Sequence, residues 1–231
     1  MRVRSLHPWN VNYREAIRIQ EKLRAEISLI NSAREVRSIA GADVSYSRDG
    51  GEAVAAMVVL SYPDLDPIDE AFSWGKISFP YIPGLLSFRE APLIIEAFQR
   101  LQRIPDVVLY DGQGIAHIRS FGLAAHMGVL LDLPSVGCAK KKLVGDFGEV
   151  GLHAGSTTSL KIDGKIVGAV IRTRRGVKPV FVSPGHRIDL QSSIGLVLKT
   201  CRGFRLPEPI RRAHLMVKRI RSLGGTAPTK K

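Results

Sequence analysis

The sequence is organised around residues 105–117, which read Pro105-Asp-Val-Val-Leu-Tyr-Asp-Gly-Gln-Gly-Ile-Ala-His117. Residues 107–110 are β-branched, aliphatic or aromatic, which is typical of a strand buried on both faces. Asp111 ends this strand and a glycine turn follows at once, at the place where open α/β sheets bind their ligands. The glycines allow a ligand to approach the backbone and its N–H groups. The alternative is a strand and tight turn in which Asp111 is only a turn former.

The composition indicates a basic globular protein. A chain of 231 residues is long enough for one domain with a large core. A net charge of +13 favours polyanionic partners, and nucleic acid is the commonest large one. The alternative is a soluble basic protein without such a partner.

Several patterns argue against a membrane or secreted protein. No apolar run reaches the roughly 18 residues that span a membrane, and the amino terminus lacks the apolar core of a signal peptide. Cys138 and Cys201 form neither a close metal pair nor a disulfide framework. We therefore expect a cytoplasmic protein that does not bind membranes, and we expect it to be a monomer.

The residues before the central strand predict a helix and an antiparallel meander. Asn12 and Glu15 resemble a capping box, and one apolar helix face is predicted to contain Ala16, Ile19, Leu23, Ile27 and Ile30. Strands are predicted at residues 38–45, 53–62 and 68–77, joined by short turns. Asp43 interrupts the first of these strands, although aspartate is depleted in strands.

A stiff loop and a helix with a buried acid follow the meander. The run Pro80-Tyr81-Ile82-Pro83 breaks the regular structure, and both prolines fix φ and remove donors. A helix is predicted from about there to residue 103. Glu90 lies four residues from both Leu86 and Ile94 on its apolar face. A glutamate facing a core is unfavourable unless something neutralises it.

The second half of the chain alternates strands and helices. The pattern predicts a helix at 119–131, a strand at 134–139, a hairpin at 160–171 and a strand at 179–183. Asp189 can cap a helix, and a last helix starts near residue 207 with His214 on its apolar face. From residue 199 onward there are ten Lys or Arg residues and one acid. Without repeats or a clear boundary, we predict a single domain at 1–224 and a disordered basic tail at 225–231.

Asp43, Glu90 and Asp111 share one description: each is an acid in an element that is otherwise buried. Each alone could be a satisfied structural acid. Together they would repel one another unless they are protonated or bridged by a cation. Such oxygen ligands suit Mg²⁺ or Mn²⁺, and a metal site in a basic protein indicates phosphodiester chemistry.

Five segments are similar to the endonuclease V family, nucleases that act at deaminated adenine. They are Gly41-Ala-Asp-Val-Ser45, Phe79-Pro-Tyr-Ile-Pro-Gly-Leu-Leu-Ser-Phe-Arg-Glu90, residues 111–117, Gly137-Cys-Ala-Lys140 and Phe181-Val-Ser-Pro-Gly-His186. The resemblance extends from the first helix to about Arg221. It implies the ribonuclease H-like α/β fold, a mixed sheet of a three-strand antiparallel meander plus parallel strands, flanked by helices.

The resemblance also implies roles for the catalytic residues. Asp43 and Asp111 would bind Mg²⁺, with Mn²⁺ able to substitute, and Glu90 would complete the acidic cluster. Lys140 would contact the phosphate near the cut, and His214 would occupy an active-site position. From the residues alone, Lys140 could equally be a surface lysine and His214 a core histidine.

Two further groups of residues are expected to recognise the base. A wedge of Pro80, Tyr81, Ile82 and Pro83 would replace the stacking of a base that has left the helix, although it could also be an ordinary structured loop. Backbone N–H groups of the 112–114 turn would donate to the C6 carbonyl of hypoxanthine, which adenine lacks. The predicted base pocket contains Leu86, Gly112, Gln113, Gly114, His117, Gly122 and Leu143. His117 could instead cap a helix.

The implied activity is that of a Mg²⁺-dependent DNA repair endonuclease. By resemblance it would hydrolyse the second phosphodiester bond 3′ to a deoxyinosine, with water as the nucleophile and no covalent enzyme intermediate. One alternative is an endoribonuclease specific for inosine in RNA, where the 2′-hydroxyl offers a further contact. Another is a nucleic-acid-binding module that has lost catalysis, against which the complete set of three acids argues.

Overall fold

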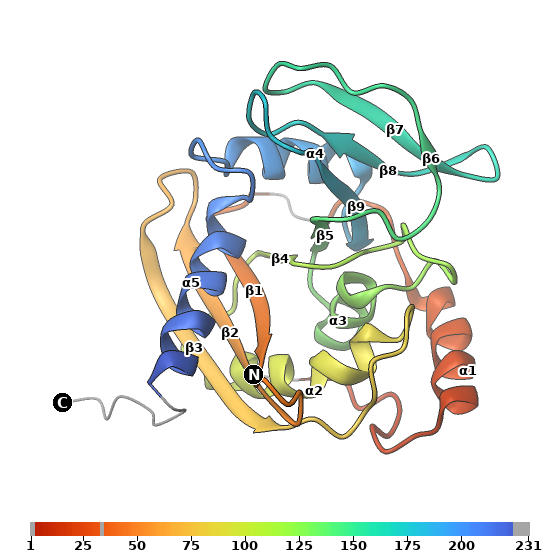
Figure 1. The fold of residues 1–231 in the computed structure, drawn as a ribbon, viewed down its shortest axis with the longest axis vertical. Coiled ribbons are helices and arrows are strands. Elements are labelled where there is room, and N and C mark those ends of the chain that lie inside the picture. Colours follow the sequence, from red (N-terminus) through yellow and green to blue (C-terminus); the bar gives the residue numbers. More distant parts are fainter. Residues whose placement is uncertain (1–2, 33–34, 224–231) are drawn as a thin grey trace.

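One mixed sheet organises the part of the chain that the computed structural model describes, residues 3–32 and 35–223 (Figure 1). Its strands lie in the order β3-β2-β1-β4-β5-β9-β8-β7-β6. Their bounds are β1 (Ser38–Tyr46), β2 (Glu52–Ser61), β3 (Pro67–Lys76), β4 (Val107–Tyr110), β5 (Ser135–Ala139), β6 (Asp146–Phe147), β7 (Thr157–Ile162), β8 (Lys165–Ile171) and β9 (Val180–His186). The predicted α/β fold with a mixed sheet is therefore confirmed.

The strand pairing follows the predicted pattern. β1 pairs antiparallel with β2, and β2 with β3, which is the expected meander. β4 joins the other side of β1 in the parallel direction, and β5 extends this parallel set. β9 then runs antiparallel to β5 and leads to the β7–β8 hairpin. All four residues of β4 are buried, as the composition of this strand predicts.

Helices cover both faces of the sheet (Figure 1). They are α1 (Tyr13–Leu23), α2 (Leu86–Arg100), α3 (Leu123–Leu131), α4 (Leu190–Lys199) and α5 (Glu208–Ser222). Successive side chains of a strand point to opposite faces, so β1 and β4 divide their residues between two cores. Ile39 and Leu109 pack with residues of α4 and α5, whereas Ala40 and Tyr110 pack with α2 and α3. Asp43 has the parity of Ile39 and therefore belongs to the face that α5 covers.

The first helix is shorter than the sequence predicts. Asn12 forms the expected capping box, but α1 ends at Leu23 and a 3₁₀ turn, η1 (Arg24–Glu26), follows. The prediction that Ile27 and Ile30 continue its apolar face is wrong. The chain leaves the helix because its backbone bonds to the residue after β9 instead: Arg187 N donates to Ser28 O at 2.6 Å.

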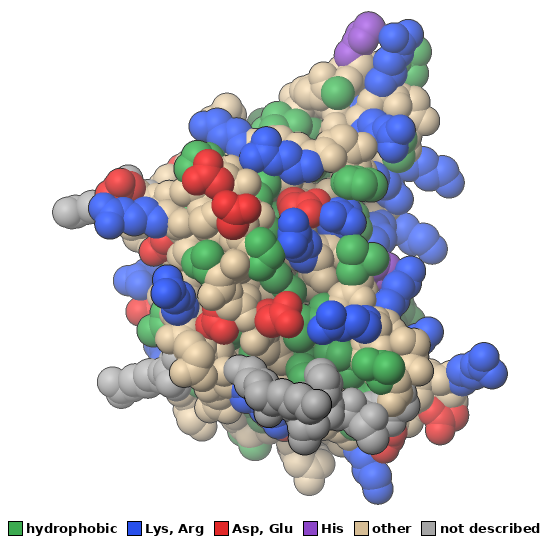
Figure 2. Space-filling model, turned by 90° about the vertical axis from the view of Figure 1, so that its left-hand side faces the viewer, with side chains coloured by type: hydrophobic (Ala, Val, Ile, Leu, Met, Phe, Trp, Pro, Cys, Tyr) green, Lys and Arg blue, Asp and Glu red, His purple; other side chains and the backbone are tan. Residues whose placement is uncertain are grey.

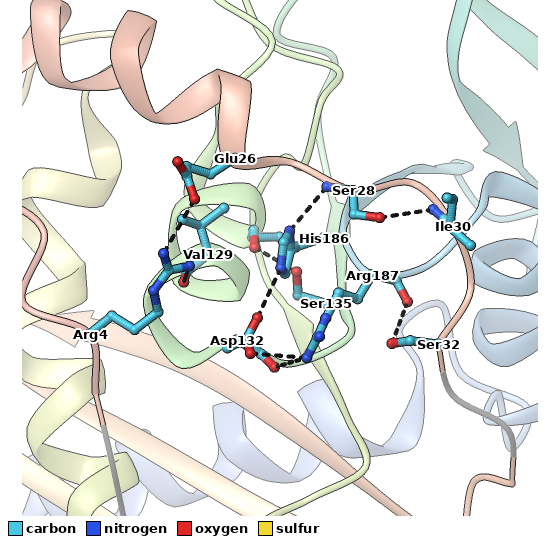
Figure 3. Close-up of polar contacts among 11 residues, drawn as sticks. Arg4, Glu26, Ser28, Ile30, Ser32, Val129, Asp132, Ser135, His186 and Arg187 are labelled. Atoms are coloured by element: carbon cyan, nitrogen blue, oxygen red, sulfur yellow. Dashed lines mark hydrogen bonds and ion pairs between the residues drawn. The ribbon is translucent and has the colours of Figure 1, made fainter.

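A polar cluster holds this departing segment, as Figure 3 shows. His186, at the end of β9, accepts a bond from Ser28 N at 3.3 Å and faces Asp132 at 3.5 Å. Arg187 also pairs with Asp132, at 3.1 Å. The cluster surrounds the amino end of β5, so it lies at the opposite end of that strand from Lys140.

The remaining helices keep their predicted places with small changes at the ends. α2 ends at Arg100 rather than residue 103, and α3 begins at Leu123 rather than 119. Asp189 caps α4 as predicted, since its side chain accepts from Ser192 N. Among the described residues, no helix has both the length and the apolar character needed to cross a membrane. The predicted tail at 225–231 lies outside the described residues.

Candidate active site

Three elements bring the three predicted acids to one edge of the sheet. β1 and β4 are parallel and Ala42 lies beside Tyr110, so Asp43 and Asp111 follow at neighbouring positions. Glu90 comes from α2, which packs against the same sheet. Asp43 and Glu90 are each only 8% exposed. The sheet register thus assembles acids that are far apart in the sequence.

Burial and mutual repulsion disfavour the charged forms of these acids. Burial raises the pKa of Asp43, and the charge of Asp111 raises it further. Burial raises the pKa of Glu90 to about 8, although the hydrogen bond from Tyr46 opposes this and the charges of Asp43 and Asp111 add to it. A positive charge placed among the three carboxylates would relieve this repulsion.

Two basic side chains already approach the acids. Lys140, one residue beyond β5, forms an ion pair with Asp111. His214 of α5 lies with Nδ1 2.7 Å from Asp43 Oδ2. Because a carboxylate oxygen accepts, Nδ1 of His214 carries the proton in this bond. Burial opposes the charged form of Lys140, but Asp111 outweighs it and the pKa of Lys140 is raised.

Glu90 is held by Tyr46, and Tyr46 in turn by Arg89, two residues to which the sequence analysis gave no role. The Tyr46 hydroxyl donates to Glu90 at 2.7 Å. Arg89 stacks on the Tyr46 ring at 4.6 Å and donates to Phe79 O at 2.7 Å and Gly50 O at 3.0 Å. Arg89 therefore joins the β1–β2 turn to the start of the wedge. The only signals for these residues were their places next to Glu90 and three positions after Asp43.

A glycine allows α5 to bring His214 to the acids. A Cβ on Gly41 would lie 2.1 Å from both the carbonyl carbon and the oxygen of Pro209. The amino end of α5 therefore rests directly on the β1 backbone, at a distance that only glycine permits. His214 is one turn and a half further along this helix, opposite Asp43.

A cavity of about 410 Å³ opens beside the acids. Of the predicted pocket, Leu86, Gly112, Gln113, His117, Gly122 and Leu143 line it, together with the wedge residues Tyr81, Ile82 and Pro83. Asp111 and Lys140 line the same cavity, so two of the predicted cleavage residues share one space with the predicted recognition residues, whereas Asp43, Glu90 and His214 do not line it. Gly114 does not line it, and Pro80 does not either. Further lining residues that the sequence did not indicate are Gln20, Ser87 and Leu123.

Two of the three predicted backbone donors of the cavity are engaged elsewhere. Gly112 N donates to Tyr110 O at 2.8 Å, and Gly114 N donates to Ser183 Oγ at 2.9 Å. The expectation that these two glycines offer free N–H groups is therefore wrong. In the described part of the chain, the N–H group of Gln113 donates to no acceptor. The same holds for the N–H groups of Leu86 and Ser87. They belong to the first turn of α2, whose N–H groups have no partner within the helix.

His117 joins the two loops that border the cavity. Its Nε2 lies 3.0 Å from Gly84 O, so this nitrogen carries the proton, and Nδ1 accepts from Arg119 N at 3.2 Å. Burial lowers the pKa of His117 to about 4, helped by the charge of Arg119 and opposed by the Gly84 bond. His117 is therefore neutral, and it both lines the cavity and caps the turn that follows.

The charge of the three acids suits a divalent cation, but their side chains are not spaced to hold one in this structure. Within residues 3–32 and 35–223, no three Asp, Glu, His or Cys side chains stand close enough together to hold a metal ion. Asp43 and Asp111 are instead paired with His214 and Lys140. Burial raises the pKa values of Asp43 and Glu90, and the charges of neighbouring acids raise them further, so a cation placed here would stabilise the charged forms. Three carboxylates of this kind are the oxygen donors that Mg²⁺ prefers.

Comparison with known proteins gives a consistent picture. Residues 21–215 match the family model described as Endonuclease V. The Endonuclease V of Methanothrix thermoacetophila is 49% identical over 222 residues, 96% of this chain and 98% of that protein. That of Dehalococcoides mccartyi (strain CBDB1) is 46% identical over 220 residues, 95% and 99% of the two chains.

Solved structures match over nearly the whole chain. The Endonuclease V of Bacillus subtilis superposes with a TM-score of 0.92 at 35% identity, covering 97% of this chain and 99% of that one. The Endonuclease V of Ciona intestinalis superposes with a TM-score of 0.77 at 28% identity, covering 91% and 98%. That protein was solved in complex with a 24mer DNA containing an inosine followed by a ribo-adenosine.

Proposed function

This chain belongs to the endonuclease V family, and we infer from this that it is a DNA repair nuclease that cleaves DNA near deoxyinosine. More specifically, we propose that it hydrolyses the second phosphodiester bond 3′ to the lesion. The observation that carries this proposal is the shared cavity, which Asp111 and Lys140 line together with the residues of the base pocket. A flipped base in that cavity would lie close to the acids, so the cut would fall near the lesion.

Asp43, Glu90 and Asp111 would hold a divalent cation, Mg²⁺ or in its place Mn²⁺. The family is generally metal-dependent, and the mutual repulsion of the three acids supports a cation here. When bound, such an ion lowers the pKa of water and stabilises the charge that develops on the phosphate and the leaving oxygen.

The basic residues of the site would orient the acids and the phosphate. His214 donates to Asp43, and this bond favours the ionised carboxylate, against the effect of burial, and fixes its direction. The Lys140 ammonium has three donors, and the ion pair with Asp111 uses one of them. A phosphate oxygen beside Asp111 can therefore accept from Lys140 without breaking the pair.

The cavity supports discrimination between hypoxanthine and adenine. The N–H groups of Leu86 and Ser87 would donate to the C6 carbonyl of hypoxanthine. Adenine carries an amino group there, so these donors would stay unsatisfied, which is unfavourable in a buried site. Guanine shares the carbonyl but has an extra amino group, which the walls formed by Leu86, Gly122 and Leu143 would exclude.

The wedge would hold the strand open while the base is in the cavity. Tyr81 is 70% exposed, which is unusual for a large aromatic ring and leaves its face available for stacking. Ile82 and Pro83 line the cavity beside it, so the stacking surface and the pocket are contiguous.

Matched oligonucleotides test this function. Each holds one inosine, as DNA or as RNA, and is incubated with Mg²⁺ and either wild type or Asp111→Asn. We expect wild type to make one nick, at the second bond 3′ to the deoxyinosine. Asp111→Asn should abolish cleavage, because it removes a charge that the cation needs, and should leave DNA binding intact.

Each other result has a definite meaning. Normal nicking by Asp111→Asn would contradict the role of Asp111. Cleavage of the RNA alone would favour the endoribonuclease, for which the ribo-adenosine in the Ciona complex is the motivating observation. If wild type binds the inosine substrates but does not nick them with Mg²⁺, the protein is a nucleic-acid-binding module without catalysis.

A further inference from the structure

The loop between β8 and β9, residues 172–179, carries cations that have no ion pair. Arg174, Arg175 and Lys178 are exposed, and none of them pairs with an acid in the described part of the chain. From Thr157 to His186 the chain has six Lys or Arg residues and one acid, Asp163. Unpaired charge of one sign attracts polyanions more strongly than charge that is already neutralised.

The carboxyl-terminal segment from residue 199, which the sequence suggests as the basic surface, uses much of its charge internally. Glu208 accepts from both Arg211 and Arg212, at 2.6 and 3.0 Å. Arg221 donates to Tyr46 O at 2.8 Å, and Arg202 donates to Pro63 O at 3.2 Å. In Figure 2, acidic and basic side chains mix on the face toward the viewer, whereas Lys and Arg side chains, with a His and some hydrophobic ones but no visible acid, project along the upper right edge.

One arginine attaches the 172–179 loop to the candidate active site. Arg205 Nη2 donates to Lys140 O at 2.6 Å and to Pro179 O at 2.9 Å. The Thr173 hydroxyl donates to Arg205 O at 2.6 Å. Both ends of the loop are therefore fixed to the residue that also holds the Lys140 backbone. A strand whose phosphate contacts Lys140 would have this loop as its neighbour.

The loop is also ordered before any partner binds. Arg172 Nη1 donates to Val177 O at 2.6 Å, which closes the loop across its own base. Its Nε and Nη2 donate to Gly151 O at 2.5 Å and Val150 O at 3.1 Å. A preformed loop loses little conformational entropy on binding, so its cations can act as fixed contacts.

We propose that residues 172–179 form a phosphate-binding loop that holds the nucleic-acid backbone outside the cut site. This inference rests on the proposed function, because it takes the strand at Lys140 as its starting point. The side chains of Arg174, Arg175 and Lys178 contact phosphates of the nucleic-acid backbone. They make no contact with the bases. The loop therefore increases the affinity for the substrate only when the nucleic acid is long enough, on one side of the lesion, to reach it.

The test compares binding of substrates with different arms. Arg174→Ala/Arg175→Ala and wild type are titrated against deoxyinosine DNA in EDTA, at several salt concentrations. The substrates have both arms long, only the 5′ arm long, only the 3′ arm long, or both arms short. The slope of log affinity against log salt should flatten by about 1.5, at roughly 0.7–0.9 per lost phosphate contact, when the arm that crosses the loop is long.

The matched control is Arg37→Ala/Arg103→Ala, which changes the net charge equally. These arginines precede β1 and β4, so they lie at the opposite end of the sheet from Asp43 and Asp111. Their removal should leave the slope unchanged.

Two results would contradict the proposed phosphate-binding role of the 172–179 loop. One is an unchanged slope on every substrate, and the other is an equal loss on the substrate with both arms short. Absence of any cut by wild type with Mg²⁺ would instead refute the proposed function, and the binding measurement in EDTA keeps the two failures apart.

Discussion

At the scale of single residues, the proposed chemistry depends on how neighbours hold the acids, and Tyr46 illustrates this. Glu90 is buried, and burial alone would keep it protonated. The Tyr46 hydroxyl donates to Glu90 and thereby favours the charged form that a cation needs. Arg89 stacks on Tyr46 and keeps its ring in place.

Tyr46→Phe should weaken cation binding. A hydrogen bond to a charged group is worth about 1.5–3 kcal/mol, so the Mg²⁺ concentration for half-maximal cleavage should rise by roughly ten- to hundredfold. Saturating Mg²⁺ should restore most of the rate. Tyr13→Phe, at an exposed position on α1, is the control. An unchanged Mg²⁺ requirement would separate Tyr46 from the function of Glu90.

Tyr81→Ala separates lesion recognition from chemistry. It removes an exposed stacking surface and leaves the acids untouched. The preference for deoxyinosine over intact DNA should fall by about 1–3 kcal/mol, and an unpaired lesion should suffer less because it opens more easily. Single-turnover cleavage of paired and unpaired substrates measures this, with Tyr13→Ala as the control. An equal loss on both substrates at saturating enzyme would mean that Tyr81 shapes the active site.

At the scale of elements, the position of α5 on β1 decides whether His214 reaches Asp43. The Pro209 carbonyl lies where a Cβ of residue 41 would be, and backbone atoms cannot move aside as a side chain can. A second contact fixes the first turn of α5: the backbone N of Glu208 donates to Thr200 O, just after α4, at 2.8 Å. The helix is thus held at its start, while His214 acts further along it.

Gly41→Ala should therefore push α5 away from β1. Overpacking of this kind costs about 1–3 kcal/mol, and cleavage should fall further than stability because the His214–Asp43 bond is lost. Urea unfolding and single-turnover cleavage measure the two effects. Gly195→Ala in α4 is the control, because a Cβ there meets nothing within 4 Å. That change should stabilise the protein by roughly 0.5–1 kcal/mol. Full activity of Gly41→Ala would refute the argument.

At the scale of the whole molecule, several histidines are kept neutral by the fold. His126 is fully buried, with Nδ1 2.9 Å from Ser87 Oγ and Nε2 2.8 Å from His7 Nε2. Only one proton fits between the two Nε2 atoms. Burial lowers the pKa of His126 well below 6.5, and the nearby His7 lowers it further. Burial also lowers the pKa values of His7, His117 and His186.

These shifts predict a loss of stability in mild acid. A histidine whose pKa is lower in the folded state takes up its proton mainly on unfolding, so its contribution is complete above 6.5 and falls as the pH drops below 6.5. Below pH 6.5, each such histidine should lower the free energy of unfolding by about 1.4 kcal/mol for each unit that the pH falls. Urea unfolding between pH 8 and pH 5 measures this.

His126→Gln should remove the contribution of one histidine from the pH dependence of the free energy of unfolding. His153→Gln, at an exposed position, should leave that pH dependence unchanged. A free energy of unfolding that stays constant from pH 8 to pH 5 would contradict the assignment.

The sequence by itself determined the local features of this protein. The apolar run at 107–110 predicts the buried β4, and the three strand patterns before it predict the meander. Asn12 and Asp189 predict the starts of α1 and α4, because each cap bonds to residues two or three positions away. The three acids were also visible, since an acid in a buried element conflicts with its surroundings.

Only the tertiary structure decided which of these features meet. Asp43 and His214 are 171 residues apart, and they are neighbours because α5 rests on Gly41. Gly112 and Gly114 offer no free N–H group to the cavity, because Tyr110 O and Ser183 Oγ already accept from them. Likewise α1 stops before Ile27, because Ser28 bonds to His186 at the end of β9 and to Arg187 just after it. Local periodicity carries no information about these contacts, since each depends on a partner that only the folded sheet brings near.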